Sequence, residues 1–352
     1  MFSPAPVARR PAERLLLDVT RAGDRLVAVG ASGLIVLSDD SGQNWRQAAV
    51  PVSATLTAVD FVDKRRGWAV GHAGVILHSD DGGENWNLQH DGRDSSRALL
   101  EIASARRAEL EEQIDRIDSG SATVDAAERD DLEYALEDAI FLEEDAQLAI
   151  ETGPADPLLD VRFIDAQRGF AAGAYGAFLR TNDGGEHWKL AVGGIDNPDR
   201  FHFYAILPSD SAGLFLVGEA GLLFRSDDAG QSFQRYDGVY DGSLFGVLPI
   251  GNSALAFGLR GNQFRYDPQS DSWSAIDSGN DFSLYGGARL EDGTLLLLGS
   301  GGMISRVSPD GETSLLLHPS RATLAAAAVA PDGRVWLVGM GGLVQLSGAT
   351  EQ

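Results

Sequence analysis

The chain has 352 residues, with 42 Gly, 13 Pro and no Cys, and 43% of its residues are hydrophobic. This composition is typical of a globular protein rich in tight turns, and the lack of Cys excludes disulfides, thiolate nucleophiles and zinc-thiolate sites. The formal net charge of −24 should repel nucleic acids and anionic lipid headgroups, so we expect no nucleic acid as a partner.

The N-terminal segment, MFSPAPVARRPAERLLL, contains no continuous apolar stretch followed by a small-residue cleavage site, so no signal peptide is visible. Apolar runs elsewhere, such as LLLLG and TLAAAAVA, fall well short of the roughly 18 to 20 residues of a membrane-spanning helix. We therefore expect no direct membrane insertion. These residues alone leave a cytoplasmic location open.

A repeat of about 40 residues runs through most of the chain. Its most regular part is a Gly-x-x-Gly turn between short apolar runs, which occurs seven times. The first glycines of these turns are Gly30, Gly71, Gly173, Gly218, Gly258, Gly299 and Gly339. The interval after the second turn is about 60 residues longer than the others, which indicates an insertion there.

Within one repeat, four β-rich runs are separated by turn signals: LTAVDFV, GWAVG, GVILHS and NWNLQ. Four strands in about 40 residues are typical of a propeller blade, and seven blades close a ring without exposed sheet edges. We predict an all-β fold, a seven-bladed β-propeller with four-stranded blades. Because the last repeat ends after its third strand, residues before Leu15 are predicted to supply the outer strand of blade seven as a clasp.

Four repeats also contain the pattern Ser/Thr-x-Asp-x-Gly-x-x-aromatic. A calcium loop would keep several oxygen ligands, whereas this pattern keeps one Asp, one Gly and one aromatic residue. We interpret it as a structural turn in which the Asp accepts backbone N–H groups and the aromatic residue packs between strands. Its members are Ser38, Asp40, Gly42 and Trp45; Ser79, Asp81, Gly83 and Trp86; Thr181, Asp183, Gly185 and Trp188; and Ser226, Asp228, Gly230 and Phe233.

The six histidines show no spacing typical of metal ligands, so we expect neither a metal nor a cofactor. The Gly-Ser-Gly-Gly sequence at Gly299–Gly302 is not followed by Lys and belongs to the repeated turn, so it is not interpreted as a phosphate loop.

The insertion, residues 93–152, is rich in helix-forming residues with apolar positions three or four apart, which predicts an antiparallel helical hairpin between blades two and three. Asp125 is the predicted cap of the second helix. The insertion carries 18 acidic and 6 basic residues, a net charge of −12. The predicted organisation is one propeller: clasp and blades one and two in residues 1–92, the hairpin in 93–152, and blades three to seven in 153–352.

Strand directions alternate within a blade, so the insertion should rise from the face that carries the Gly-x-x-Gly turns, with the Asp patterns on the opposite face. One interpretation is a solvated hairpin tolerated in a loop; the other is a protein-docking surface made by the hairpin and this face. The candidate docking residues are Tyr134, Phe141 and Leu148 on the hairpin, and His72, Tyr175, Arg200, Phe201, His202, Glu219, Arg260 and Met340 on the propeller.

The combination Gly-Trp/Phe-Ala-x-Gly-x-x-Gly, followed by Ser/Thr-x-Asp-x-Gly-x-x-Trp, resembles the Asp-box, or bacterial neuraminidase repeat, of photosystem II stability/assembly factor-like propellers. The resemblance covers nearly all of the chain outside residues 92–156 and implies a non-enzymatic assembly or accessory factor. Proteobacterial proteins of this kind are implied to be exported and to accompany transporters of the resistance-nodulation-division superfamily. The implied partner is therefore a membrane transporter, and the implied location is the periplasm.

The photosynthetic members of this family are implied to bind a photosystem precursor through a basic patch, from which this acidic chain departs. The alternative function is a glycan-binding or sialidase-like glycoside hydrolase propeller, because sialidases share the Asp-box. The sequence contains no Arg-Ile-Pro, although arginines and tyrosines are available for such a site. An arginine cluster with a Tyr and a carboxylate in the central pocket would favour sugar chemistry.

Overall fold

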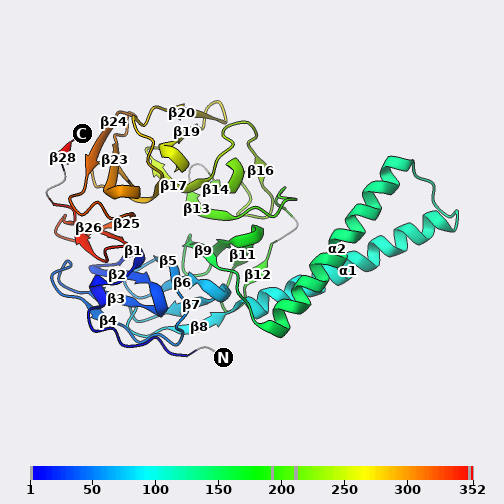
Figure 1. The fold of residues 1–352 in the computed structure, drawn as a ribbon, viewed down its shortest axis with the longest axis horizontal. Helices are drawn as coiled ribbons and strands as arrows, with labels where there is room; N and C mark the ends of the chain where they lie inside the picture. The colour runs from blue at the N-terminus through cyan, green and yellow to red at the C-terminus, as the bar shows by residue number, and fades with distance from the viewer. Residues whose placement is uncertain (1–2, 192–193, 210–212, 348–349, 352) are drawn as a thin grey trace.

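Seven β-sheets stand around a central axis in the computed structural model, which describes residues 3–191, 194–209, 213–347 and 350–351 (Figure 1). They are the blades of the predicted propeller, and neighbouring strands within each blade are antiparallel. A long helical hairpin lies between blades two and three in the chain. The inserted hairpin and the seven-bladed ring are both as the sequence predicted.

The first strand of each blade lies nearest the axis. These inner strands are β1 (Leu16–Ala22), β5 (Leu56–Phe61), β9 (Leu158–Phe163), β13 (Phe203–Ser209), β17 (Leu244–Ile250), β21 (Leu284–Arg289) and β25 (Leu324–Val329). Inner strands of neighbouring blades contact one another all the way round, and β25 contacts β1, which closes the ring.

The second strands are buried over nearly their full length between neighbouring blades, which explains their apolar sequences. They are β2 (Arg25–Gly30), β6 (Gly67–Gly71), β10 (Gly169–Gly173), β14 (Gly213–Gly218), β18 (Ser253–Gly258), β22 (Leu295–Gly299) and β26 (Val335–Gly339). The third strands are β3 (Ile35–Ser38), β7 (Ile76–Ser79), β11 (Phe178–Thr181), β15 (Leu223–Ser226), β19 (Gln263–Asp267), β23 (Met303–Val307) and β27 (Val344–Gln345).

The outer strands are short and mostly exposed. They are β4 (Arg46–Gln47), β8 (Asn87–His90), β12 (Lys189–Leu190), β16 (Gln234–Arg235), β20 (Ser272–Ile276) and β24 (Thr313–Leu317). Between the second and third strands of the first six blades, the Gly-x-x-Gly sequence forms a short 3-10 turn: η2 (Ala31–Gly33), η3 (His72–Gly74), η4 (Ala174–Gly176), η5 (Glu219–Gly221), η6 (Leu259–Gly261) and η7 (Ser300–Gly302).

Blade seven has three strands among the described residues, and the prediction that residues before Leu15 form its outer strand is wrong. Pro4, Pro6 and Pro11 lack the N–H groups that a strand ladder needs, so this segment is irregular apart from the 3-10 turn η1 (Pro11–Glu13). It contacts blade seven through a backbone hydrogen bond of 2.8 Å, from the Leu343 N–H to the Ala12 carbonyl, and through Ala8, which packs against the apolar core shared by blades one and seven. A further short strand, β28 (Thr350–Glu351), pairs with β24 of blade six.

The hairpin consists of α1 (Gly92–Asp118) and α2 (Ala126–Thr152). Asp91 and Asp94 form a capping box at the start of α1, and Asp125 caps α2 by accepting the Glu128 N–H, as predicted. The two helices bury small and apolar side chains against each other: Ala103 and Leu110 of α1, and Ala139 and Ala146 of α2.

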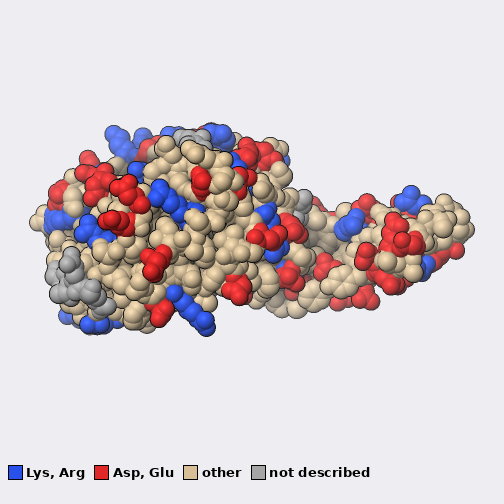
Figure 2. All heavy atoms as spheres, turned by 90° about the horizontal axis from the view of Figure 1, so that it is seen from above, with Lys and Arg blue, Asp and Glu red and all other residues tan. Residues whose placement is uncertain are grey.

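The base of the hairpin lies beside the Gly-x-x-Gly turn of blade two, since a Cβ on Gly74 would come within 2.7 Å of the Gly92 Cα. From there the hairpin extends outward from the rim (Figures 1 and 2). The sequence-based expectation that the hairpin rises from the face is therefore wrong in direction: it leaves from the rim (Figures 1 and 2). Its helices are too polar to cover the propeller, so they bury one another and leave the face open.

Candidate partner-docking surface

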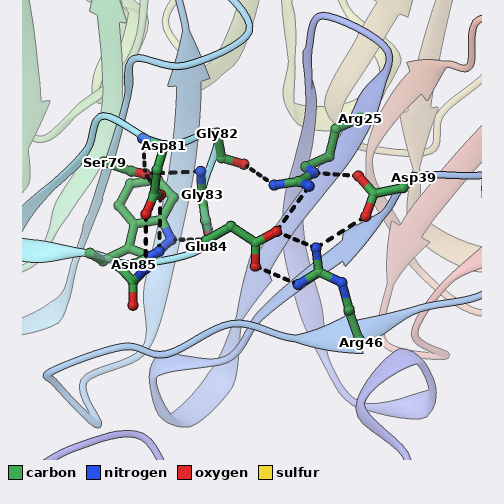
Figure 3. Close-up of polar contacts among 10 residues, drawn as sticks. Arg25, Asp39, Arg46, Ser79, Asp81, Gly82, Gly83, Glu84 and Asn85 are labelled. Atoms are coloured by element: carbon green, nitrogen blue, oxygen red, sulfur yellow. Dashed lines mark hydrogen bonds and ion pairs between the residues drawn. The ribbon is translucent and has the colours of Figure 1, made fainter.

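The Asp-box of blade two is a closed hydrogen-bonded corner (Figure 3). The Asp81 carboxylate accepts the Ser79 hydroxyl at 2.9 Å and the Asn85 backbone N–H at 3.0 Å, and the Ser79 hydroxyl accepts the Gly83 N–H at 2.9 Å. Gly83 has a φ of +88°, which disfavours a side chain. Trp86 is buried and donates its indole N–H to the Gly83 carbonyl at 2.9 Å.

The other three boxes repeat the bonds of the hydroxyl and the carboxylate, and the indole bond recurs in blade one, from Trp45 to the Gly42 carbonyl. In each box, the residue four positions after the Asp makes two hydrogen bonds to the Asp carboxylate. One comes from its backbone N–H and the other from its side chain. These residues are Asn44, His187 and Ser232. The backbone N–H of Asn44 lowers the pKa of Asp40 to about 2, and the corresponding N–H lowers the pKa of Asp183 to about 2. Among the described residues no three His, Asp or Glu side chains are grouped to hold a metal.

Two arginines and two carboxylates join the Asp-box loops of blades one and two (Figure 3). Arg25 lies 2.5 Å from Asp39 and 2.9 Å from Glu84, and Arg46 lies 3.0 Å from Asp39 and also pairs with Glu84. Every charge in this group has a partner. Asp39 and Glu84 therefore hold the Asp-box loops of blades one and two together.

On the opposite face, the third residue of the Gly-x-x-Gly sequence stands in the left-handed backbone region in the first six blades, including Tyr175 with a φ of 53° and Arg260 with a φ of 56°. Arg200, in the loop between blades three and four, has a φ of 55°. Residues other than glycine are disfavoured in this conformation by about 1 kcal/mol or more, because their Cβ crowds the backbone. Neighbouring contacts hold these residues there, and Tyr175 and Arg260 are left exposed.

Four of the predicted docking residues form a polar cluster of blades three and four: Tyr175, His202 and Glu219, which are linked through His202, and Arg200, two residues before His202 in the same loop. The Tyr175 N–H donates to His202 Nδ1 at 3.1 Å, and the two rings lie 5.0 Å apart. The His202 N–H donates to Glu219 at 3.1 Å. Arg200 lies 4.0 Å from Asp145 of α2, so this cluster adjoins the hairpin.

A row of aromatic rings continues from His202 across blades four to six. The ring of Tyr204 lies 6.2 Å from His202 and 5.2 Å from Phe245, which lies 5.4 Å from Tyr285. Tyr204, Phe245 and Tyr285 are each the second residue of an inner strand, where a β-bulge interrupts the ladder. They stand at the end of the inner strands nearest the Gly-x-x-Gly turns.

Phe245 and Tyr285 were not among the residues predicted from the sequence, and Tyr204 is one of the tyrosines counted there only as available for a sugar site. The repeat contains a signal for this row. The inner strands of blades four to six begin with FYA, LFG and LYG, so their second residue is aromatic. At the same position, blades one to three and seven have Leu17, Thr57, Leu159 and Ala325. Aligning the strand starts would have found it.

The remaining predicted docking residues on the propeller are not part of this cluster. His72, Arg260 and Met340 each lie exposed on a separate turn, and Met340 has 71% of its surface exposed. Phe201 is half-buried and packs against the apolar core of blades three and four. Phe201 therefore supports the loop that positions Arg200 and His202.

The inner strands of blades one to three, which lie nearest the ring axis, carry a group of charged side chains. Asp18, Asp60 and Asp160 accept the backbone N–H of Val59, Phe163 and Ile206, respectively, each in the next blade, at 2.8 to 2.9 Å. Arg162 lies 3.2 Å from Asp160. Burial raises the pKa of all three carboxyls, that of Asp160 to about 6.

This group does not have the arrangement expected of a sialidase. It has one arginine amid three carboxylates, and the carboxylates are occupied by backbone N–H groups of the neighbouring blades. It therefore serves to connect blades.

The hairpin presents Tyr134, Phe141 and Leu148 on the outer side of α2, with 76%, 59% and 57% of their surfaces exposed. A spacing of seven residues places them in one row along the helix. Asp145 lies on the same side of α2, between Phe141 and Leu148, and its contact with Arg200 makes the row continuous with the polar cluster. No helix in the described part of the chain is long and apolar enough to cross a membrane.

The fold and the four closed corners define a seven-bladed propeller of the Asp-box class. The family described as photosynthesis system II assembly factor YCF48 matches residues 37–106 and 143–352, and the chain belongs to this family. The family is one of assembly factors, so the chain is grouped with proteins that are not enzymes. The outer part of the hairpin, residues 107–142, lies outside the match.

A curated relative, the photosystem II assembly lipoprotein Ycf48 of Synechococcus sp. (strain CC9902), is 30% identical over 125 residues. The match covers 34% of this chain and 37% of that protein, so it spans little more than a third of the relative's length.

Solved structures share the fold at low sequence identity. YCF48 bound to D1 peptide is 15% identical with a TM-score of 0.61, covering 97% of this chain and 98% of that one. YCF48 from Cyanidioschyzon merolae is 14% identical with a TM-score of 0.61, covering 98% of both chains. The WD40 propeller domain of Doa1 is 10% identical with a TM-score of 0.62, covering 98% of this chain and 96% of that one.

Proposed function

We propose that this chain is a non-enzymatic assembly or accessory factor that docks on a partner protein through the hairpin and the Gly-x-x-Gly face. The observation that carries the proposal is the contact between Asp145 of α2 and Arg200 of the propeller. It joins the exposed row of α2, the polar cluster and the aromatic row into one surface, so a single partner can touch all three. Exposed aromatic residues flanked by charged groups are frequent anchors in protein interfaces.

We propose that the partner is a membrane transporter of the resistance-nodulation-division superfamily. In this proposal the chain itself is exported and meets the transporter in the periplasm. The support for this partner is the resemblance of the repeats to proteobacterial proteins of the family. An exported location is supported by the Synechococcus relative, which is described as a lipoprotein. Binding to a protein segment is supported by the related propeller described as YCF48 bound to D1 peptide.

A glycan ligand is the second candidate, because the aromatic row offers ring faces of a kind on which sugars can stack. It is the weaker one, since the axial charged group holds a single arginine whose neighbouring carboxylates are already bonded to backbone. A glycan would bind the propeller without needing the hairpin.

The test is co-purification from host membranes with the tagged full chain and a variant in which residues 94–151 are replaced by a short Gly-Ser linker. The replacement is feasible because Gly92 and Pro154 are in contact; a Cβ on Gly92 would lie 2.4 Å from the Pro154 Cβ. We expect a transporter subunit to be enriched by the full chain and lost with the hairpin-replaced chain. The control variant is Gln43→Ala with Gln231→Ala, two exposed residues of the Asp-box face, which should retain the partner.

The hairpin-replaced chain should keep the β-sheet circular dichroism spectrum and cooperative unfolding of the propeller, because the helices bury chiefly each other. Recovery of the same transporter in equal amount by this folded variant would contradict the proposal. Loss of the transporter with the control variant would show that the partner docks on the Asp-box face instead.

A further inference from the structure

The charge of the hairpin is distributed unequally between its two helices. In α1 there are 7 acidic and 5 basic residues, a net charge of −2, whereas α2 has 10 acidic and 1 basic, a net charge of −9. The arginines of α1 are largely paired within the hairpin, for example Arg107 with Glu111 at 2.8 Å and with Glu143 at 3.0 Å. The uncompensated charge therefore lies on α2. Figure 2 shows that acidic side chains predominate on the surface of the hairpin.

The exposed row of Tyr134, Phe141 and Leu148 lies on this same helix, on the side opposite Ala139 and Ala146, which pack against α1. A helix of 3.6 residues per turn places acidic residues along both edges of the row: Asp130, Glu137 and Glu144 on one edge, and Asp131 and Asp138 on the other. All five are exposed, and within the described part of the chain none of them has an ion-pair partner.

An apolar row at seven-residue spacing with charged edges is the pattern of one partner in a helix-helix interface, in which the edge charges select the other helix. A second copy of this chain does not fit, because it would bring another net charge of −9 against the first. A helix with apolar residues at the same spacing and Lys or Arg at its edges would pair with all five carboxylates.

Resting on the proposed function, we infer that the outer side of α2 is the docking site for an amphipathic helix with basic edges on the partner protein. The contact of Asp145 with Arg200 sets one end of the site, because a helix lying along the row would meet the propeller at the polar cluster. The outer part of this site falls in residues 107–142, outside the family match, so it is an addition of this chain to the common propeller.

The test uses two fluorescently labelled synthetic peptides of four heptads with Leu at the apolar positions, one with Lys and one with Glu at the edges. Binding to the full chain is measured by fluorescence anisotropy. We expect the Lys peptide to bind at least about tenfold more tightly than the Glu peptide, and its affinity to fall as salt is raised.

Replacing the row by Tyr134→Ser, Phe141→Ser and Leu148→Ser should weaken binding of the Lys peptide at least about tenfold. The control variant, Val7→Ser with Ile102→Ser, removes exposed apolar surface elsewhere and should bind as the unchanged chain does. Circular dichroism of the row variant should retain the helical signal, because the three side chains face solvent.

Equal binding of the two peptides, binding of neither, or a full-chain dimer in analytical ultracentrifugation that the row variant abolishes would overturn this inference. These outcomes are distinct from failure of the proposed function. If neither peptide binds while the hairpin-replaced chain still loses its transporter, only the chemistry inferred for α2 is wrong. If the hairpin-replaced chain keeps its transporter, the proposed function is wrong whatever the peptides do.

Discussion

The Asp-box carboxylates show how a residue that resembles an active-site group serves structure instead. Asp81 accepts a hydroxyl, a backbone N–H and the Asn85 side-chain amide, so its oxygens are occupied within its own turn. Desolvation opposes ionisation of Asp81, but the hydrogen bonds from Asn85 outweigh it and lower its pKa. A group that is ionised and fully bonded is a poor proton donor or nucleophile.

Asp81→Ala should destabilise the propeller by about 1 to 2 kcal/mol, because Ser79 and Asn85 each lose an acceptor. The measurement is the free energy of unfolding in urea. Asp80→Ala is the matched control, since Asp80 is exposed at the variable position of the same turn, and it should change stability by less than about 0.5 kcal/mol. Equal effects of the two substitutions would show that the corner bonds contribute little.

Residue-scale prediction from the sequence succeeded where a residue's role is local or repeated along the chain, and it failed where position in three dimensions decides the role. Asp125 was found as a helix cap because capping is local. Phe201 was placed on the surface, although it packs into the core, because a loop sequence does not reveal which side chain turns inward. Asn85 was overlooked because its equivalents are His and Ser in other repeats.

Among the elements, the inner strands of blades one to three are joined by the carboxylates of Asp18, Asp60 and Asp160, each bonded to the next blade. Burial raises the pKa of Asp160 to about 6, so the folded chain holds a proton there that the unfolded chain has released. The stability that this group contributes is present at low pH and is lost as the pH rises through about 6.

Asp160→Asn should therefore reduce the fall in unfolding free energy between pH 4.5 and pH 7, because the substituted side chain cannot ionise. The control is Asp165→Asn, in the exposed turn after β9. The backbone N–H of Arg168 lowers the pKa of Asp165, so its contribution is lost as the pH falls, and this substitution should alter only the acid side of the profile. Urea unfolding across pH checks both, and unchanged slopes in Asp160→Asn would contradict the role given to this carboxyl.

Element prediction was accurate for the strands because turns and apolar runs recur with a fixed period. It failed for the outer strand of blade seven, where counting strands outweighed the local chemistry of Pro4, Pro6 and Pro11. The direction of the hairpin could not be read from its sequence either, since the angle is set by the Asp91 capping box and by the contact of Gly92 with Pro154.

In the whole molecule, the two faces of the propeller differ in how their charges are used. Arginines and carboxylates on the Asp-box face of blades one and two are paired with one another, whereas α2 carries seven exposed carboxylates without ion-pair partners in the described structure, five of them along the edges of its exposed row. Half of the net charge of −24 lies on the insertion, residues 93–152. This asymmetry supports the proposal that a partner docks on the hairpin side.

Site-specific photo-cross-linking in the native host tests the central claim most directly. A photoreactive amino acid at Phe141 on the hairpin, or at Tyr285 in the aromatic row, is compared with one at Gln43 or Gln231 on the Asp-box face. The account predicts that positions 141 and 285 cross-link to the same protein, a membrane transporter subunit, and that positions 43 and 231 do not. Cross-links to that protein from the Asp-box face, with none from the hairpin, would contradict it.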